Sequence, residues 1–255
     1  MQENNHILEL QRLKKVFGGV VALDELSFAV KRNTITSVIG PNGAGKTTVF
    51  NLITSYLRPT SGVMIYKGHL LKQKKPHRTA ALGIGRTFQN VQIFADMTVL
   101  ENVMVGRHLR SRAGITASAL IPSFLRPEEN KIKEDAARCL EFVGLSHTAE
   151  MPAGTLPLGN QRMLEIARAL AIEPDLLLLD EPASGLNSRE TIAMGELIGR
   201  IKEKGITVML VEHDMELVMD VSDNVAVMNF GKLLAEGTPR QIQQNMEVID
   251  AYLGQ

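Results

Sequence analysis

The chain has one cysteine, no tryptophan and only 4% aromatic residues among its 255 positions. A single cysteine, Cys139, excludes an internal disulfide and suits a reducing compartment. It lies in residues 136–142, a run with helical character. A small thiol in such a run is more often a core residue than a nucleophile. The sequence therefore predicts a packing role for Cys139.

The chain also lacks an excess of either charge, since 28 Lys and Arg balance 28 Asp and Glu. Domains that bind nucleic acid normally carry a basic excess. We therefore expect no nucleic-acid partner.

Long apolar runs are missing as well. No run approaches the ~18 residues that a membrane helix needs, and residues 1–6 show no basic region leading into an apolar stretch. We expect a cytosolic chain without a signal peptide or a membrane span. This leaves binding to a membrane protein open.

What the sequence does contain is an alternation of strand and helix patterns. Strands are predicted at residues 7–17, 21–30, 34–39, 62–68, 175–180 and 207–211, and a hairpin at 225–234. Helices are predicted at 48–53, 189–204 and, as two short pieces, 239–253. Residues 98–170 are mostly helical in pattern, but 107–133 is irregular, with Pro122 and Pro127 interrupting any long helix.

This order indicates an α/β fold with a parallel sheet wrapped by helices. We expect one domain over 1–255, a helical subdomain inserted at about 90–165 and a helical tail at about 238–255.

Residues 40–47, GPNGAGKT, fill the pattern G-x-x-x-x-G-K-[ST] between a predicted strand and a predicted helix. Glycines let backbone N–H groups turn toward one anion, and the helix N-terminus adds its dipole. Lys46 is expected to reach the β- and γ-phosphates of a nucleotide, and Thr47 to ligate Mg²⁺. The expected nucleotide-binding residues here are Asn42, Gly43, Ala44, Gly45, Lys46, Thr47 and Thr48.

Four leucines followed by Asp180 and Glu181 form the second signal. A carboxylate at the end of a buried strand can hold Mg²⁺ through water, and a second one beside it can polarise an attacking water. Alone, the two acids would most simply be a solvated strand end. Together with a phosphate loop, they predict hydrolysis of a nucleoside triphosphate.

With these residues in place, the whole chain resembles the ABC-type ATPases. Further matches are RTFQN at 86–90, LPLGNQR at 156–162 followed by IARAL at 166–170, SGLN at 184–187, and VEHD at 211–214. The resemblance implies a P-loop NTPase fold with a mainly parallel sheet core, an antiparallel β subdomain and an inserted α-helical subdomain. It also implies ATP and Mg²⁺ as ligands.

The resemblance assigns roles to individual positions. Gln89 would ligate Mg²⁺ and water, His213 would contact the γ-phosphate, and Phe17 would stack on adenine. Gly159 and Gln161 would contact the nucleotide of an opposing subunit in a head-to-tail sandwich. Taken singly, Gln89 could be a surface residue, His213 an ordinary residue at a strand end and Phe17 a core residue.

Two segments depart from the family pattern. Pro157 stands where the family has serine, and Leu158 where it has glycine, so a hydroxyl and an N–H donor are missing. Asn187 replaces a common aspartate, which removes a charge and keeps a hydrogen-bonding group. If the partner ATPase is a different chain with an intact signature, the site built on Lys46 and Glu181 should be the better of two unequal sites.

Within the family, the chain is most similar to the larger, LivG-type ATP-binding subunit of branched-chain amino acid importers. The similarity covers residues 39–51, 86–91, 211–215 and 251–254, and the long insert near 107–133. It implies a second, different ATPase subunit, two membrane permease subunits and, indirectly, an external solute-binding protein. The chain would then lie peripherally on the inner face of the membrane.

The resemblance also places a permease contact at residues 90–97. Ile93 and Phe94 could form that contact, or they could pack into the helical subdomain.

Other functions remain open from the sequence. A related importer of urea or short amides and an ATPase for lipopolysaccharide export are the nearest alternatives, because this subunit does not touch the cargo. A non-transport ABC ATPase would usually carry two ATPase domains or a coiled-coil insert. A purely regulatory module would lack Lys46 or Glu181, and both are present.

Overall fold

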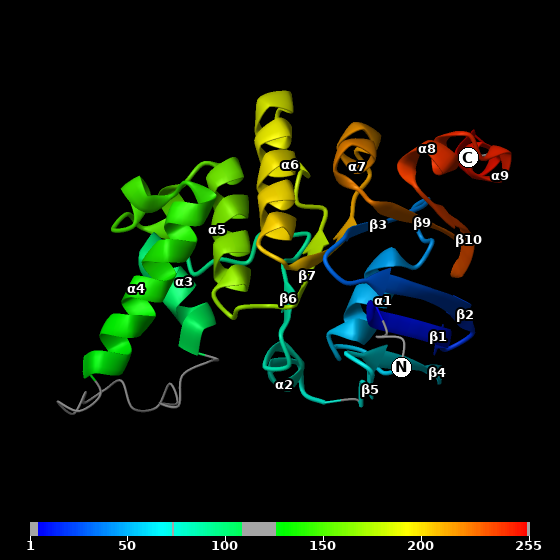
Figure 1. Cartoon of the computed structure of the whole chain (residues 1–255), viewed down its shortest axis with the longest axis horizontal. Coiled ribbons are helices and arrows are strands. Elements are labelled where there is room, and N and C mark those ends of the chain that lie inside the picture. The colour runs from blue at the N-terminus through cyan, green and yellow to red at the C-terminus, as the bar shows by residue number, and fades with distance from the viewer. Residues whose placement is uncertain (1–4, 73, 109–125, 254–255) are drawn as a thin grey trace.

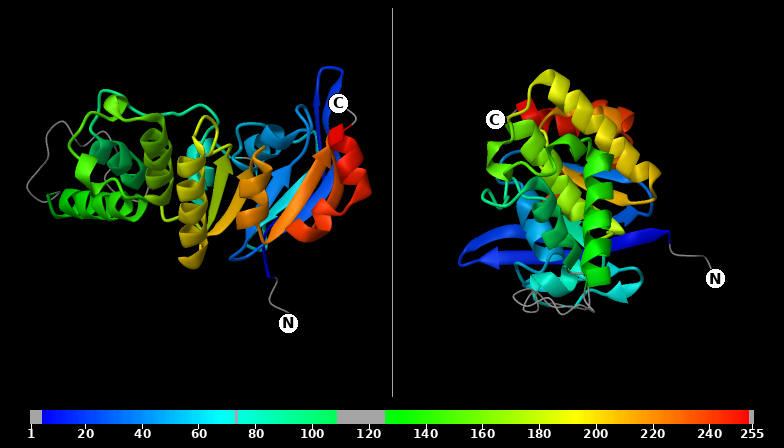
Figure 2. Two further views of the ribbon diagram at one scale, coloured as in Figure 1. Left: turned by 90° about the horizontal axis from the view of Figure 1, so that it is seen from above. Right: turned by 90° about the vertical axis from the view of Figure 1, so that its left-hand side faces the viewer.

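The computed structural model describes residues 5–72, 74–108 and 126–253. Two β-sheets lie side by side at one end, and a group of helices lies at the other (Figures 1 and 2). The α/β architecture expected from the alternating pattern is confirmed.

The larger sheet has six strands in the order β10-β9-β3-β8-β7-β6. Its strands are β3 (Ile35–Ile39), β6 (Ile84–Arg86), β7 (Leu176–Asp180), β8 (Thr207–Val211), β9 (Asn224–Asn229) and β10 (Lys232–Gly237). All neighbours are parallel except β9 and β10, which form the predicted hairpin. Every residue of β3, β7 and β8 is buried, as expected for parallel strands covered on both faces.

The smaller sheet is antiparallel, in the order β2-β1-β4-β5. It contains β1 (His6–Phe17), β2 (Val20–Lys31), β4 (Ser61–Tyr66) and β5 (His69–Leu70). Helix α1 (Lys46–Ile53) lies between the two sheets. Its Phe50 is fully buried in a cluster that includes Leu10 of β1 and Leu178 of β7, so the two sheets share one core.

Three helices form the helical part: α3 (Val99–His108), α4 (Arg126–Val143) and α5 (Leu158–Leu170). They pack on one another, and the 3₁₀ turns Ser146–Thr148 and Ala153–Thr155 connect α4 to α5. Their apolar side chains, such as Leu140 and Leu164, join a second cluster that reaches Leu177 of β7. The inserted helical subdomain is thus present, while its limits at 90 and 165 stay a prediction.

The remaining helices are α2 (Pro76–Ala80), α6 (Ser188–Glu203), α7 (Met215–Val221), α8 (Pro239–Gln243) and α9 (Met246–Leu253). Helices α8 and α9 are the two predicted tail segments, and Ile242 and Val248 bury them against Ile39 and Val227 of the large sheet. Within the ranges that the structure describes, none of the helices combines the length and apolar character that a membrane crossing requires.

One prediction in the irregular stretch is wrong. Helix α4 begins at Arg126, so residues 126–133 are helical, and Pro127 stands in the first turn of the helix. Proline is tolerated there because the first N–H groups of a helix have no partner within it. Residues 107 and 108 also belong to a helix, α3. The rest of the stretch, with Pro122, lies outside the described residues.

Cys139 is half-buried on α4 and packs against the helical cluster. Burial raises the pKa of its thiol. A raised pKa disfavours the reactive thiolate, in agreement with the predicted packing role.

The position that departs from the common aspartate, Asn187, caps helix α6. Its side chain accepts hydrogen bonds from the N–H groups of Arg189 and Glu190, at 3.1 Å each. The Glu190 carboxylate accepts in return from the N–H of Asn187 at 3.0 Å. Asparagine and aspartate are about equally good at this position.

We therefore predict that Asn187→Ala lowers the free energy of unfolding by about 1 kcal/mol, because two N–H groups lose their acceptor. Asn187→Asp should stay within a few tenths of a kcal/mol of the native value, roughly the spread among good caps. Urea denaturation followed by circular dichroism measures both. Equal losses in the two variants would contradict the capping role.

Candidate active site

The predicted phosphate loop connects β3 to α1, as the motif requires. A Cβ at Gly40 would lie 2.0 Å from the carbonyl oxygen of Met228, and one at Gly45 would lie 2.7 Å from that of Ala22. Both glycines also have positive φ, at 149° and 102°. The loop can therefore press against β9 and β2 only with glycine at these places. Gly43, with φ of 82°, has open space where a Cβ would stand.

Lys46 folds back over this loop. Its Nζ donates hydrogen bonds to the carbonyl oxygens of Gly40, at 2.6 Å, and Pro41, at 3.0 Å. Burial lowers the pKa of Lys46, and the nearby charges of Glu181 and Asp180 oppose this shift. The ammonium group thus lies within the electrostatic reach of both predicted carboxylates.

Strand register explains why these distant segments meet. Val211 of β8 pairs with Val38 of β3 on one side and with Asp180 of β7 on the other. Because parallel strands end at the same edge of a sheet, the segments after all three strands meet there. Beyond its strand, Glu181 turns into the left-handed region at φ 49°, and its N–H donates to the carbonyl oxygen of Val211 at 2.8 Å.

Two other predicted residues, Gln89 and His213, converge on Glu181. Gln89 Nε2 donates to Glu181 Oε2 at 3.0 Å. His213 Nδ1 lies 3.7 Å from the same oxygen, and the histidine side chain is 66% exposed. The Glu181 carboxylate is thus approached by two polar groups and stays partly open to solvent.

Glu212 fixes the loop that carries His213. It is buried, and it accepts hydrogen bonds from the N–H groups of Ala183, at 2.8 Å, and His213, at 2.9 Å. Sequence reasoning missed this role. The available signal was an acidic residue directly after a fully apolar strand.

Asp180 is almost fully buried, with 2% of its side chain exposed. Burial raises the pKa of Asp180, and the hydrogen bond and charge of Arg86 oppose the rise. Arg86 Nη2 lies 2.9 Å from Asp180 Oδ2. Arg86 was not among the predicted site residues, although a charge directly after the apolar pair Ile84 and Gly85 was visible.

Phe17 is not a core residue, because 43% of it is exposed at the end of β1. Lys15 Nζ lies 4.7 Å from the centroid of its ring. The ring is therefore accessible to a flat ligand.

The signature segment stands apart from this cluster. Pro157 caps α5, Gly159 is buried against the Glu190 side chain, and Gln161 Nε2 donates to the carbonyl oxygen of Leu156 at 2.8 Å. Helices α5 and α1 lie on opposite sides of β7 in Figure 1. Among the described residues, no hydrogen bond or ion pair joins 156–161 to the phosphate loop. Within one chain, Gly159 and Gln161 are thus not brought to the site.

A different residue of α5, Arg162, contacts the site indirectly. Arg162 donates to the carbonyl oxygens of Gln89, at 2.7 Å, Phe88, at 3.2 Å, and Ser184, at 3.3 Å. No local sequence pattern distinguishes this arginine from a surface arginine. Through it, helix α5 holds the backbone on which Gln89 stands.

A cavity of about 700 Å³ opens beside Gln92 and is lined by aromatic and aliphatic side chains. Phe94 lines it and is 47% exposed, with Arg168 at 5.6 Å from the ring centroid. Ile93 also lines it but packs partly against the helical cluster. Phe94 is therefore exposed, as a permease contact requires, whereas Ile93 packs into the helical part of the chain.

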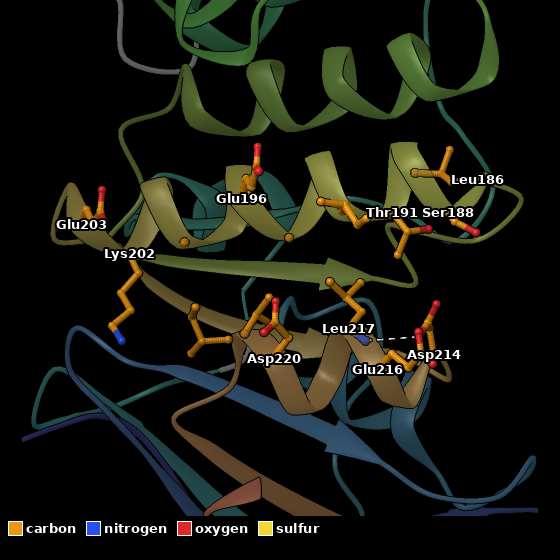
Figure 3. Close-up of a pocket in the computed structure, with 15 residues that line it drawn as sticks. Leu186, Ser188, Thr191, Glu196, Lys202, Glu203, Asp214, Glu216, Leu217 and Asp220 are labelled. Atoms are coloured by element: carbon orange, nitrogen blue, oxygen red, sulfur yellow. Dashed lines mark hydrogen bonds between the residues drawn. The ribbon is translucent and has the colours of Figure 1, made fainter.

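Another cavity, of about 780 Å³, lies between α6 and α7 and does not include the predicted site residues (Figure 3). Its lining carries one lysine, Lys202, which is paired with Asp223 at 2.6 Å. It also carries five carboxylates, from Glu196, Glu203, Asp214, Glu216 and Asp220. A surface of this charge repels a polyphosphate, so this cavity is not the nucleotide site.

The side chains at the strand edge fit a magnesium ion. Among the described residues, no group of three His, Cys, Asp or Glu side chains forms a ready metal cage. Mg²⁺ is commonly held by only one or two carboxylates together with substrate phosphates and water. Thr47, Gln89 and Asp180 offer the oxygen donors that such a site uses.

Comparison with known proteins agrees with this geometry. Residues 23–184 match the family model described as ABC transporter, and residues 232–255 match one described as branched-chain amino acid ATP-binding cassette transporter. The chain is 44% identical over 250 residues to the high-affinity branched-chain amino acid transport ATP-binding protein BraF of Pseudomonas aeruginosa, covering 98% of each. It is 43% identical over 251 residues to LivG of Escherichia coli K12, also covering 98% of each.

Solved structures give the same result. A nucleotide-free ATP-binding cassette from an ABC transporter matches with a TM-score of 0.86 and 32% identity, over 98% of this chain and 100% of that one. An ATP-binding cassette in its ADP conformation matches with a TM-score of 0.86 and 33% identity, over 98% and 99%. The chain therefore belongs to the family of ABC transporter ATPases.

Proposed function

We propose that this chain is the ATP-hydrolysing subunit of an importer for branched-chain amino acids. The observation that carries the proposal is the match of the tail, residues 232–255, to a model specific for branched-chain amino acid cassettes. The curated relatives BraF and LivG, similar over almost the full length, point to the same cargo. An importer of urea or short amides and a lipopolysaccharide exporter remain outcomes of the test below.

The hydrolytic role is assigned to the residues at the strand edge. Glu181 orients or deprotonates the water that attacks the γ-phosphate, and Gln89 and His213 hold its carboxylate in place and contact water and phosphate. Lys46 swings from the carbonyl oxygens of Gly40 and Pro41 to the β- and γ-phosphates. A charged phosphate oxygen is a stronger hydrogen-bond acceptor for the ammonium group than a neutral carbonyl oxygen. Thr47, Asp180 and Gln89 would hold a bound Mg²⁺, which would neutralise part of the phosphate charge.

The rest of the nucleotide site follows the same logic. The loop from Asn42 to Thr48 binds the phosphates through backbone N–H groups and the start of α1. The exposed ring of Phe17 stacks on adenine. Gly159 and Gln161 act on the nucleotide of a second ATPase subunit, since they do not reach the site of their own chain.

The aromatic cavity beside Gln92 is the proposed contact with the membrane permease. Its exposed Phe94 and the neighbouring Tyr56 and Phe88 provide an apolar surface next to the segment that carries Gln89. A permease loop seated there would press on that segment, which connects transport to hydrolysis. Two permease subunits and an external solute-binding protein complete the proposed importer.

The first prediction of the proposed function tests the cargo. In the source cells, Glu181→Gln should abolish initial uptake of labelled leucine while the protein is still made. Unchanged leucine uptake would contradict the branched-chain assignment, and uptake of urea and envelope-lipid phenotypes would then be measured. The ATPase assignment does not depend on this result.

The second prediction isolates the chemistry. In the assembled transporter, Glu181→Gln should lower ATP turnover by roughly 10² to 10⁴-fold, the usual contribution of a positioned general base. ATP binding should persist, because the glutamine keeps the size of the side chain and the phosphate loop is intact. Phosphate release and filter binding measure the two properties. Loss of binding with turnover would argue against the assigned role.

The third prediction concerns Pro157. With a partner ATPase that has an intact signature, vanadate trapping of a photoreactive ATP should label this chain, whose Lys46 faces the intact signature, more than its partner. Pro157→Ser should raise labelling of the partner, because it restores a hydroxyl and an N–H donor. Equal labelling of the two native chains would contradict the predicted asymmetry.

The fourth prediction tests the permease contact. Phe94→Asn should reduce co-purification of the permease. Burial of a large apolar side chain contributes about 1.5–3 kcal/mol to the free energy of binding, and the variant loses this contribution. Phe230→Asn, a matched change of a phenylalanine that is 83% exposed in the β9–β10 turn, should leave co-purification unchanged. Equal effects of the two variants would reject the docking surface.

A further inference from the structure

Within the part of the chain that the structure describes, Arg86 is the one buried cationic side chain that contacts Asp180. Only 6% of its side chain is exposed. Its guanidinium carbon lies 5.0 Å from the ring centroid of Phe88, 5.6 Å from that of Phe50 and 5.9 Å from that of Tyr56. A buried guanidinium is costly unless it is paired, so its partners indicate what it is kept for.

The hydrogen-bond partners of the Arg86 guanidinium belong to two different elements. Nη2 donates to Asp180 Oδ2 at the end of β7, at 2.9 Å. Nη1 donates to Asn51 Oδ1 at 2.8 Å and to Thr54 Oγ1 at 3.0 Å, at the C-terminal end of α1. Arg86 itself ends β6. One side chain therefore ties together β6, β7 and α1.

Helix α1 begins at Lys46 and Thr47. The proposed Mg²⁺ ligands Thr47 and Asp180 thus stand on the two elements that Arg86 connects. Arg86 occupies Oδ2 of Asp180 and leaves Oδ1 for another partner. It also pairs its positive charge with the buried carboxylate of Asp180.

We propose that Arg86 is a positioning residue for the Mg²⁺–nucleotide complex: it holds the Asp180 carboxylate in a fixed orientation and at a fixed separation from Thr47. This rests on the nucleotide site proposed above and adds a residue to it. Groups that orient a metal-ligating carboxylate typically account for 10- to 100-fold in metal affinity. Arg86 has no contact with the nucleotide in this role and acts only through Asp180.

The test compares nucleotide affinity with and without the metal in the isolated full-length chain. The fluorescent methylanthraniloyl derivative of ATP is titrated in EDTA and in excess Mg²⁺. The dissociation constant in EDTA divided by that in Mg²⁺, called the Mg²⁺ ratio below, reports how much Mg²⁺ stabilises the complex. Arg86→Gln should lower this ratio by about tenfold, with affinity in EDTA changed far less. Arg86→Lys keeps the charge but not the forked geometry, and should fall between the native chain and Arg86→Gln.

A matched control separates positioning from general stability. Arg107 is a largely buried arginine with 13% of its side chain exposed, and it lies in the helical part of the chain, paired with Asp135 at 2.6 Å and with Glu173 at 2.9 Å. Arg107→Gln should lower the thermal midpoint as Arg86→Gln does, yet keep the native Mg²⁺ ratio. If Arg86→Gln does not fold, Asn51→Ala and Thr54→Val release the other end of the guanidinium and should lower the ratio to a smaller degree.

The outcomes distinguish this inference from the proposed function. A native Mg²⁺ ratio in folded Arg86→Gln, or in Arg86→Lys together with Asn51→Ala, overturns the positioning role and leaves the ATPase assignment intact. A larger ratio would show that Arg86 repels the metal more than it orders the carboxylate, and would also overturn it. No nucleotide binding by the native chain would overturn both.

Discussion

The site depends on the register of three buried parallel strands. Val38, Val211 and Asp180 pair across β3, β8 and β7, so the segments that follow these strands emerge at one edge. That register brings the phosphate loop close to Glu181 and His213, both of which lie more than a hundred residues later in the sequence. A slip of β7 by one residue would turn Asp180 to the other face of the sheet. The uniform burial of all three strands, with apolar side chains on both faces, makes such a slip costly.

The edge is then refined by a small number of polar contacts. Glu212 holds the backbone around His213, Arg162 holds the backbone of Gln89, and Arg86 connects Asp180 with α1. None of these three residues contacts the expected position of the reacting phosphate. They fix loops that the strand register brings close but does not orient.

The sequence predicted the strands, the phosphate loop and the acidic pair, because each of these has a local pattern. Short runs rich in apolar residues predicted β3, β7 and β8, and a fixed glycine spacing predicted the loop. The prediction that residues 126–133 are irregular is wrong because it treats Pro127 as a helix breaker. Proline is compatible with the first turn of a helix, where Pro127 stands in α4. The roles of Arg86, Arg162 and Glu212 depend on contacts with residues far away in the sequence. Arg86 contacts Asp180 across 94 residues, Arg162 contacts Gln89 across 73, and Glu212 contacts Ala183 across 29. No local pattern encodes such contacts.

In the proposed mechanism, the γ-phosphate of ATP binds at this edge and Glu181 faces the attacking water. A structure of the Glu181→Gln chain with Mg²⁺ and ATP tests this directly. We expect the γ-phosphate between Lys46 and His213, the metal beside Thr47 and Asp180, and the adenine on Phe17. A nucleotide bound elsewhere, or a γ-phosphate out of reach of residue 181, would contradict it.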